Sequence, residues 1–241
     1  MALMALKALA GVVAVGAAIG VAAAPSAGAR QPSVVRPTQE LVGLLTSHTA
    51  VSALRGRASR VARVPASRPI TGARTTLPVL AHRTTPGGAR WLRVMIPGRP
   101  NGRKGWIKQR GTVPVKTSWH VLVRTSTRRV QVYFRGRLNR SFAAIVGKPS
   151  TPTPHGRFFV EESVRMLRGS AGAPYALALS ARSNVLQEFA GGPGQIALHG
   201  VQNLGGTPGT AISHGCVRLA DSHIRWLAAR IAPGVPVTIT R

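Results

Sequence analysis

Short apolar runs with a two-residue period mark most of the second half of the chain. Residues 119–123 and 129–134 alternate apolar and polar side chains, and a polar turn at 125–128 separates them. Because successive side chains of a strand point to opposite faces, both runs are predicted to be neighbouring strands. The same reasoning predicts further strands at 138–146, 156–163, 175–179, 195–199 and 235–240.

One segment of this half has the spacing of an amphipathic helix. Asp221 or Ser222 is its predicted N-cap, and Pro233 follows its end. The apolar stripe of this helix is formed by Ile224, Leu227, Ala228 and Ile231. Residues 113–241 are therefore predicted to form a mostly-β domain, of the β-sandwich or barrel-like class, with one clear helix.

Residues 67–112 are predicted to form a small β module, SH3-like in size, ahead of that domain. Apolar pieces separated by Gly- and Pro-rich turns lie at 77–80, 91–96 and 105–107. Trp91 and Trp106 are either platforms for stacking on sugars or members of a small core, and we favour the core.

Residues 30–66 are predicted to be a linker. The apolar spacing within 38–54 fits one short helix, whereas 55–68 is rich in Arg, Ala and Ser and is expected to be disordered. Residues 1–29 have the layout of a signal peptide: Lys7, then an apolar run at 8–24. A small-x-small site precedes Arg30, so cleavage after Ala29 is expected, and an uncleaved anchor is the alternative.

The large positive charge of the chain limits the kinds of partner that it is expected to bind. The chain has 33 Lys and Arg against 5 Asp and Glu, a net charge of +28 at pH 7. Such an excess suggests nucleic acid, but it is spread along the whole chain and no recognition motif focuses it. No specific nucleic-acid partner is predicted. For an exported protein the expected polyanions are anionic polymers and lipid head groups of the cell envelope, and we expect it on the outer face of the membrane or in the wall.

The small number of carboxylates limits the catalytic and metal-binding sites that the chain can form. With only 5 acidic residues, a hydrolase built on paired carboxylates and a carboxylate-rich Mg²⁺ or Ca²⁺ site are both disfavoured. The seven histidines lack the spacing of a zinc site. We therefore predict neither a metal site nor a cofactor.

The chain has a single cysteine, Cys216, which cannot form an intramolecular disulfide. It lies in the segment 213–219, Ser-His-Gly-Cys-Val-Arg-Leu, and these neighbours are poor core material. Upstream, His199 ends an apolar run and a Gly-rich loop follows it. Two adjacent strand ends joined by that loop would bring His199 to Cys216.

A cysteine beside a histidine is the arrangement that thiol catalysis requires. A free thiol is mostly protonated at neutral pH, and an imidazole that accepts its proton leaves a strong nucleophile. The alternative is that Cys216 is a small buried hydrophobe and that His199 is structural. The polar neighbours of Cys216 favour catalysis.

At these residues the sequence resembles the L,D-transpeptidase catalytic family, the YkuD-type domain. The resemblance rests on His199-Gly200, twelve residues, then Ser213-His214-Gly215-Cys216-x-Arg218. The segments 151–158 (Thr-Pro-Thr-Pro-His-Gly-Arg-Phe) and 175–179 are also similar to that family, so the match covers about half of the chain, 117–241. The segment 91–107 resembles a β segment that precedes this domain in some actinobacterial members.

The resemblance implies roles for individual residues. Cys216 would be the nucleophile and His199 its base, oriented by the carbonyl of Gly200. The remaining candidates would line or support the site: the amides of Gly215 and Cys216 as oxyanion hole, His214 and Ser213 around it, and Arg218 and Tyr175 as substrate-binding or structural residues.

The resemblance also implies the reaction. A peptidoglycan stem tetrapeptide would acylate the cysteine through a thioester, and an amine of a second stem would complete a 3→3 cross-link. Water in place of the amine would make the protein an L,D-carboxypeptidase. Two further readings stay open: a secreted thiol peptidase acting on L,L peptides, and a non-catalytic basic protein that binds the cell wall. The sequence does not predict an oligomeric state.

Overall fold

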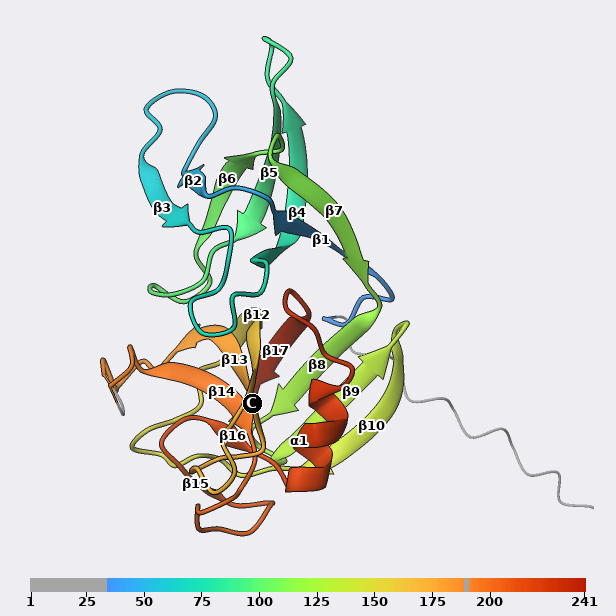
Figure 1. The fold of residues 1–241 in the computed structure, drawn as a ribbon, viewed down its shortest axis with the longest axis vertical. Helices are drawn as coiled ribbons and strands as arrows, with labels where there is room; N and C mark the ends of the chain where they lie inside the picture. Colours follow the sequence, from blue (N-terminus) through green and yellow to red (C-terminus); the bar gives the residue numbers. More distant parts are fainter. Residues whose placement is uncertain (1–33, 189–190) are drawn as a thin grey trace, which may run out of the picture. The chain divides into compact units, whose positions relative to one another are not determined.

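The computed structural model describes residues 34–188 and 191–241, so the predicted signal peptide lies outside the described residues. These residues contain two large β-sheets and one α-helix (Figure 1). The prediction of a mostly-β fold with one clear helix is therefore confirmed.

The C-terminal sheet has eight strands in the order β10-β9-β8-β17-β12-β13-β14-β16. Most neighbours are antiparallel, but the pairs β17–β8 and β14–β16 run parallel. The strands are β8 (Trp119–Arg124), β9 (Arg129–Phe134), β10 (Arg137–Ala143), β12 (Gly156–Arg165), β13 (Tyr175–Arg182), β14 (Gln195–His199), β16 (Val217–Arg218) and β17 (Pro236–Thr240). A separate two-stranded sheet pairs β11 (Val146–Gly147) with β15 (Ala211–Ser213).

The helix α1 (Asp221–Ala228) buries Ile224 and Leu227 in the core of this sheet. The predicted cap is wrong, because Ala220 is the N-cap and has no side-chain hydrogen bond. The carboxylate of Asp221 instead accepts the amide of Val201 at 3.2 Å. This bond joins the first turn of the helix to the segment that follows β14.

The N-terminal sheet has seven strands in the order β3-β2-β6-β5-β4-β1-β7. They are β1 (Gln39–Leu44), β2 (His48–Val51), β3 (Arg60–Val64), β4 (Thr76–Thr84), β5 (Arg90–Met95), β6 (Lys104–Lys108) and β7 (Thr112–Thr117). This sheet and its loops are called the β module below. It is larger than the predicted 67–112.

The linker prediction for residues 30–66 is wrong where the structure describes them. The expected helix within 38–54 is replaced by β1 and β2, and the supposedly disordered 55–68 contains β3. The physical reason is visible in β1, which pairs with β4 on one side and β7 on the other. Leu41 and Val42 are adjacent and both buried, so β1 lacks the alternation of a half-buried strand.

The tryptophans do not build the core of the module. Trp91 and Trp106 are half-buried, and Arg83 lies over the ring of Trp106 at 5.9 Å. Buried aliphatic side chains form that core, and Phe159 of the C-terminal sheet joins them. Its neighbour Phe158 points to the opposite face of β12 and enters the other core. One strand thus contributes to both cores.

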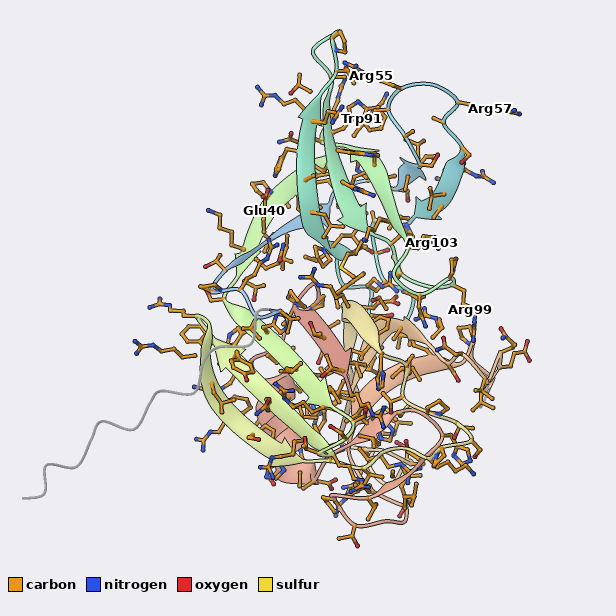
Figure 2. The ribbon with its side chains drawn as sticks, turned by 180° about the vertical axis from the view of Figure 1, so that it is seen from behind. Glu40, Arg55, Arg57, Trp91, Arg99 and Arg103 are labelled. Atoms are coloured by element: carbon orange, nitrogen blue, oxygen red, sulfur yellow. The ribbon has the colours of Figure 1, made fainter. Side chains whose placement is uncertain are left out.

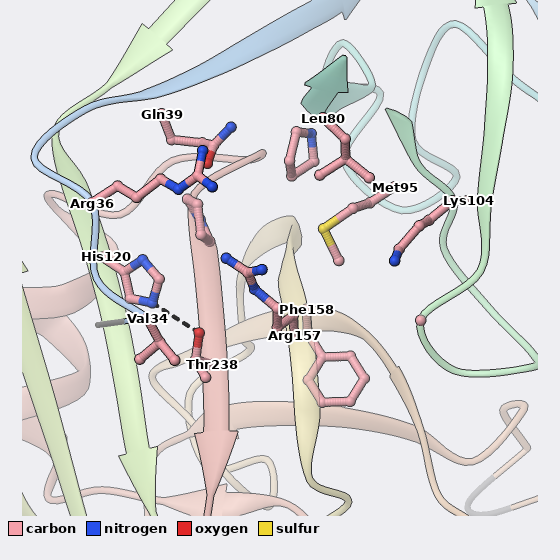
Figure 3. Close-up of a pocket in the computed structure, with 13 residues that line it drawn as sticks. Val34, Arg36, Gln39, Leu80, Met95, Lys104, His120, Arg157, Phe158 and Thr238 are labelled. Carbon is pink, nitrogen blue, oxygen red and sulfur yellow. Dashed lines mark hydrogen bonds between the residues drawn. The ribbon is translucent and has the colours of Figure 1, made fainter. Parts of the chain in front are cut away.

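A cavity of about 260 Å³ lies between the module and the C-terminal sheet (Figure 3). Met95 and Phe158 contribute apolar walls, and Arg36, Lys104 and Arg157 contribute cationic side chains. His120 also lines the cavity. Its Nε2 lies 2.9 Å from the hydroxyl oxygen of Thr238.

We expect His120 to make the fold sensitive to acid. Burial, assisted by the charge of Arg157, lowers the pKa of His120 from 6.5 to about 4. Between these values the unfolded chain binds the proton more readily, so the free energy of unfolding falls as pH drops from about 6.5 to 4, by about 3 kcal/mol in all. Urea unfolding at several pH values measures this loss. His120→Gln should flatten it, whereas the same change at exposed His82 should not; equal slopes for all three proteins would contradict the assignment.

Candidate active site

The site lies where two parallel strands meet. Leu198 and His199 of β14 pair with Val217 and Arg218 of β16. In this register the last two residues of β14 lie beside β16, the strand that directly follows Cys216 (Figure 1). The fold therefore brings together the two predicted strand ends, although seventeen positions separate His199 from Cys216.

One cavity of about 340 Å³ is lined by half of the predicted site residues, including the cysteine and the histidine. Cys216, His199, His214 and Arg218 all line it. Other lining residues were not predicted from the sequence: Ala171, Ser183, Leu186, Gly194, Gln195, Ile196 and Leu204. The wall is mostly apolar, which suits a site that excludes water.

The imidazole of His199 is held by its own neighbour. Its Nδ1 lies 2.8 Å from the carbonyl oxygen of Gly200, as the resemblance implied. A carbonyl only accepts hydrogen bonds, so Nδ1 carries the proton and Nε2 is the basic nitrogen. Burial lowers the pKa of His199, and the charge of Arg218 lowers it further, against the opposing effect of the Gly200 bond. The ring is therefore a neutral base at neutral pH.

The thiol of Cys216 is protonated at rest. Burial raises its pKa, while a backbone hydrogen bond at Ala197 and the charge of Arg218 act in the opposite direction. The thiol donates to the carbonyl of Gln195 at a sulfur–oxygen distance of 3.9 Å. These pKa directions favour a neutral thiol–imidazole pair at rest, in which His199 takes the proton only as the thiol reacts.

The backbone before Cys216 is shaped by Ser213 and Gly215. The Ser213 hydroxyl donates to the carbonyl of Cys216 at 2.5 Å and accepts the amide of Gly215 at 3.1 Å. Gly215 has a φ of +117°, a conformation that side chains disfavour. Ser213 therefore supports the turn that precedes Cys216. The amide of Gly215 is directed at Ser213, so the oxyanion role implied for it is available only if that bond breaks.

Two threonines from another part of the chain are hydrogen-bonded to the same turn. Thr151 donates its hydroxyl to the carbonyl of Ser213 at 3.1 Å, and Thr153 donates to that of Gly215 at 2.8 Å. Both are buried. They belong to the Thr-Pro-Thr-Pro motif, for which the sequence suggested no role. The sequence drew attention to this motif but could not predict its partners. Both threonines bind backbone carbonyls, and every residue has one, so no particular residue type marks the partner.

Glycines create room for His199. Gly172 has a φ of +85°, and a β-carbon there would lie 2.7 Å from Nδ1 of His199. A β-carbon on Gly200 would lie 1.9 Å from the carbonyl oxygen of Ala173. Gly200 thus has a steric role besides its carbonyl, and Gly172 is a site residue that sequence reasoning missed.

Arg218 and Tyr175 have different surroundings. Arg218 donates through Nη1 to the carbonyl of Gly205 at 2.9 Å, which braces the loop after β14. Its Nε is buried with no hydrogen-bond partner among the described residues. Tyr175 packs against the core and lines a second cavity, together with Arg165 and Arg168. The structure does not place it among the residues around Cys216.

The described residues contain neither a candidate metal site nor a candidate membrane-spanning helix. Across 34–188 and 191–241, no group of three or more His, Cys, Asp or Glu side chains is placed to hold a metal ion. Over the same ranges, no helix has the length and apolar character needed to cross a membrane.

Comparison with known proteins agrees with this geometry. A family model described as the L,D-transpeptidase catalytic domain (YkuD) matches residues 118–239, about half of the chain. The chain is similar to the putative L,D-transpeptidase YkuD of Bacillus subtilis, 27% identical over 148 residues, which cover 61% of this chain and 74% of that one. The corresponding Bacillus licheniformis protein is 29% identical over 147 residues, covering 61% and 73%.

Solved structures give weaker likenesses. An L,D-transpeptidase from Mycobacterium smegmatis aligns at 15% identity with a TM-score of 0.42, over 64% of this chain and 91% of that one. L,D-transpeptidase 3 from Mycobacterium tuberculosis aligns at 14% identity with a TM-score of 0.45, over 69% and 91%. The family match settles the class: the chain belongs to the L,D-transpeptidase catalytic domain family and is an enzyme of that class.

Proposed function

We propose that the protein is a cysteine-dependent peptidoglycan L,D-transpeptidase that forms 3→3 cross-links between stem peptides. One observation carries the proposal: the thiol of Cys216 and the basic imidazole of His199 line the same largely apolar cavity. The family membership supports the proposed substrate class, and the positions of the residues support the roles proposed for them.

In the first step the sulfur of Cys216 attacks the carbonyl carbon of the third stem residue. His199 accepts the thiol proton on Nε2 as the carbon–sulfur bond forms. The carbon–nitrogen bond to the terminal D-alanine then breaks, and the same proton passes from His199 to the leaving amine. A thioester remains on Cys216. The charge developing on the carbonyl oxygen is stabilised by the backbone amide of Cys216, an interaction of a kind whose loss costs about 3–4 kcal/mol.

In the second step an amine of another stem attacks the thioester. His199 accepts the proton of that amine, and the thiol is restored as the new amide forms. Water in the place of the amine gives the carboxypeptidase reaction at the same site. We assign Arg218 to a substrate carboxylate, because its Nε is buried and lacks a protein partner among the described residues.

The protein is proposed to act outside the cytoplasm. Its substrate class lies in the wall, and a net charge of +28 favours retention on the anionic polymers of the envelope. A basic wall-binding protein without activity is the rival, and it predicts salt-sensitive polymer binding with no covalent intermediate.

Intact-protein mass spectrometry tests the proposal. After incubation with a stem tetrapeptide, the mass should rise by that of the tetrapeptide less one alanine, and peptide mapping should place the adduct on Cys216. Addition of an acceptor stem should remove the adduct and yield a cross-linked dimer. Release of free tripeptide alone would identify the carboxypeptidase. Failure to form any adduct under reducing conditions, with a folded protein, would reject the proposal.

A further inference from the structure

One loop of the β module contacts a segment that lines the active-site cavity. Residues 97–103 connect β5 to β6 and contact the segment that joins β13 to β14 (Figure 2). That segment, described at 183–188 and 191–194, is called the wall segment below. The contacts come chiefly from Arg99 and Asn101.

The guanidinium of Arg99 gathers the carbonyls of the wall segment. Its Nη2 donates to Ser183 at 2.9 Å and to Leu186 at 2.8 Å. Its Nη1 donates to Pro193 at 2.8 Å and, at a longer 3.5 Å, to Gln187. One planar group with five N–H donors thus satisfies carbonyls from both ends of the wall segment.

Asn101 holds the start of the same segment. Its side-chain amide donates to the carbonyl of Arg182 at 2.7 Å, and its oxygen accepts the amide of Arg182 at 2.8 Å. The amide also donates to the side-chain oxygen of Asn184 at 3.1 Å. The paired bonds to Arg182 continue the hydrogen bonding of β13 at the point where that strand ends.

The wall segment leads directly to the thiol. Ser183, Leu186 and Gly194 line the cavity that contains Cys216. Gly194 is followed by Gln195, whose carbonyl accepts the thiol hydrogen bond.

The two ends of the wall segment are hydrogen-bonded to each other, and the backbone around Gly194 is tightly packed. The amide of Ser183 donates to the carbonyl of Gly194 at 2.7 Å. Gly194 has a φ of +61°, and a β-carbon there would lie 2.1 Å from the Leu186 carbonyl oxygen and 3.1 Å from Arg99. The Pro193 carbonyl that Arg99 binds lies two residues before the Gln195 carbonyl that accepts the thiol hydrogen bond.

We propose that Arg99 and Asn101 are positioning residues, through which the β module shapes the active-site cavity. By fixing the wall segment they keep Cys216 shielded from water and keep the carbonyl of Gln195 in place. The module is then an integral part of the site and not a spacer or a wall-binding attachment. The effect on turnover rests on the function proposed above, whereas the effect on the thiol does not.

Arg99→Ala in the full chain tests this arrangement. Loss of the guanidinium leaves the carbonyls at both ends of the wall segment without a donor, so the segment should open more often. Hydrogen exchange at the amides of Ser183 and Leu186 should accelerate by about tenfold or more. Better solvation of the sulfur lowers its pKa toward the ordinary value, so alkylation of Cys216 by iodoacetamide should accelerate several-fold.

Matched variants separate positioning from general damage. Arg57→Ala removes an exposed arginine from another loop of the module and should change neither readout. Arg99→Lys should restore part of the protection, and Asn101→Asp, which keeps the acceptor but loses the donor, should accelerate exchange at the Arg182 end of the segment.

Two outcomes would overturn the proposal. Unchanged exchange and alkylation in Arg99→Ala would show that the wall segment stands without the module. Exchange that accelerates equally in β8 and β9, with a lowered Tm, would show a general structural role only. If the thiol responds as expected but the wild-type protein never releases D-alanine, the positioning role holds and the proposed function fails.

Discussion

Cys216→Ser is expected to reduce release of D-alanine from a stem tetrapeptide by at least about a thousandfold, since loss of a catalytic nucleophile removes the covalent pathway. A hydroxyl is a far weaker acid than a thiol, and the imidazole of His199 is held at Nδ1 by the carbonyl of Gly200 and not by a carboxylate, so it should activate a serine much less well. The change is nearly isosteric, and the half-buried thiol bonds only weakly to the backbone of Gln195 and Ala197. The Tm should therefore stay close to that of the wild type. Coupled detection of D-alanine, together with a thermal melt, measures both.

The same variant distinguishes the rival function. A basic wall-binding protein would keep its polymer binding in Cys216→Ser and lose that binding with added salt, because exposed charges are screened. His199→Gln is a second control, since it keeps a polar side chain but removes the base and should be nearly as inactive. Substantial D-alanine release by Cys216→Ser would exclude Cys216 as the nucleophile.

Glu161→Ala is expected to destabilise the fold by about 3–5 kcal/mol, because it leaves buried cations without their counter-charge. Glu161 is only 2% exposed. It forms an ion pair with Arg68 of the β module and accepts Arg182 Nη1 at 3.0 Å. Burial lowers the pKa of both arginines, which shows that their charged forms are held in a poorly solvated place. Urea unfolding measures the loss.

Glu40→Ala is the matched control (Figure 2). Glu40 also pairs with a basic residue, His82, at 2.8 Å, but the two side chains are 40% and 52% exposed. Surface pairs of this kind contribute roughly 0–1 kcal/mol, so little change is expected. Equal losses in the two variants would show that burial does not decide the contribution of Glu161.

Glu161 also touches the active site. Gln195 donates its side-chain amide to the Glu161 carboxylate at 3.4 Å and to the carbonyl of Leu179 at 2.9 Å. The module is therefore linked to the active-site cavity by two routes: Arg68 reaches Gln195 of β14 through Glu161, and Arg99 binds the wall segment that precedes β14. The chain has only 5 Asp and Glu, and one of them is used for this contact.

The chemistry of the site could be predicted from sequence because it is concentrated in one short motif. Cys216 has no other cysteine to pair with, and its polar neighbours argue against a core position. The strands β8 and β9 could be predicted for a related reason, because apolar side chains recur along both runs, although residues 120–123 of β8 are all buried in the structure. The prediction failed at β1, where residues 41–44 are all buried and the partner strands β4 and β7 lie about 35 and 75 positions further along the chain.

The sequence by itself determined that the single cysteine lies in the segment 213–219 with His214 and Arg218, and that His199 lies a short distance upstream. It also determined that the surrounding chain is mostly β. Only the tertiary structure decided the protonation of the thiol–imidazole pair, because burial sets both pKa values. It alone decided how the module is used, because Arg99 and Asn101 bind mainly backbone groups of a segment more than 80 positions away. Every residue carries a backbone carbonyl, so no sequence pattern marks the carbonyls that an arginine will bind.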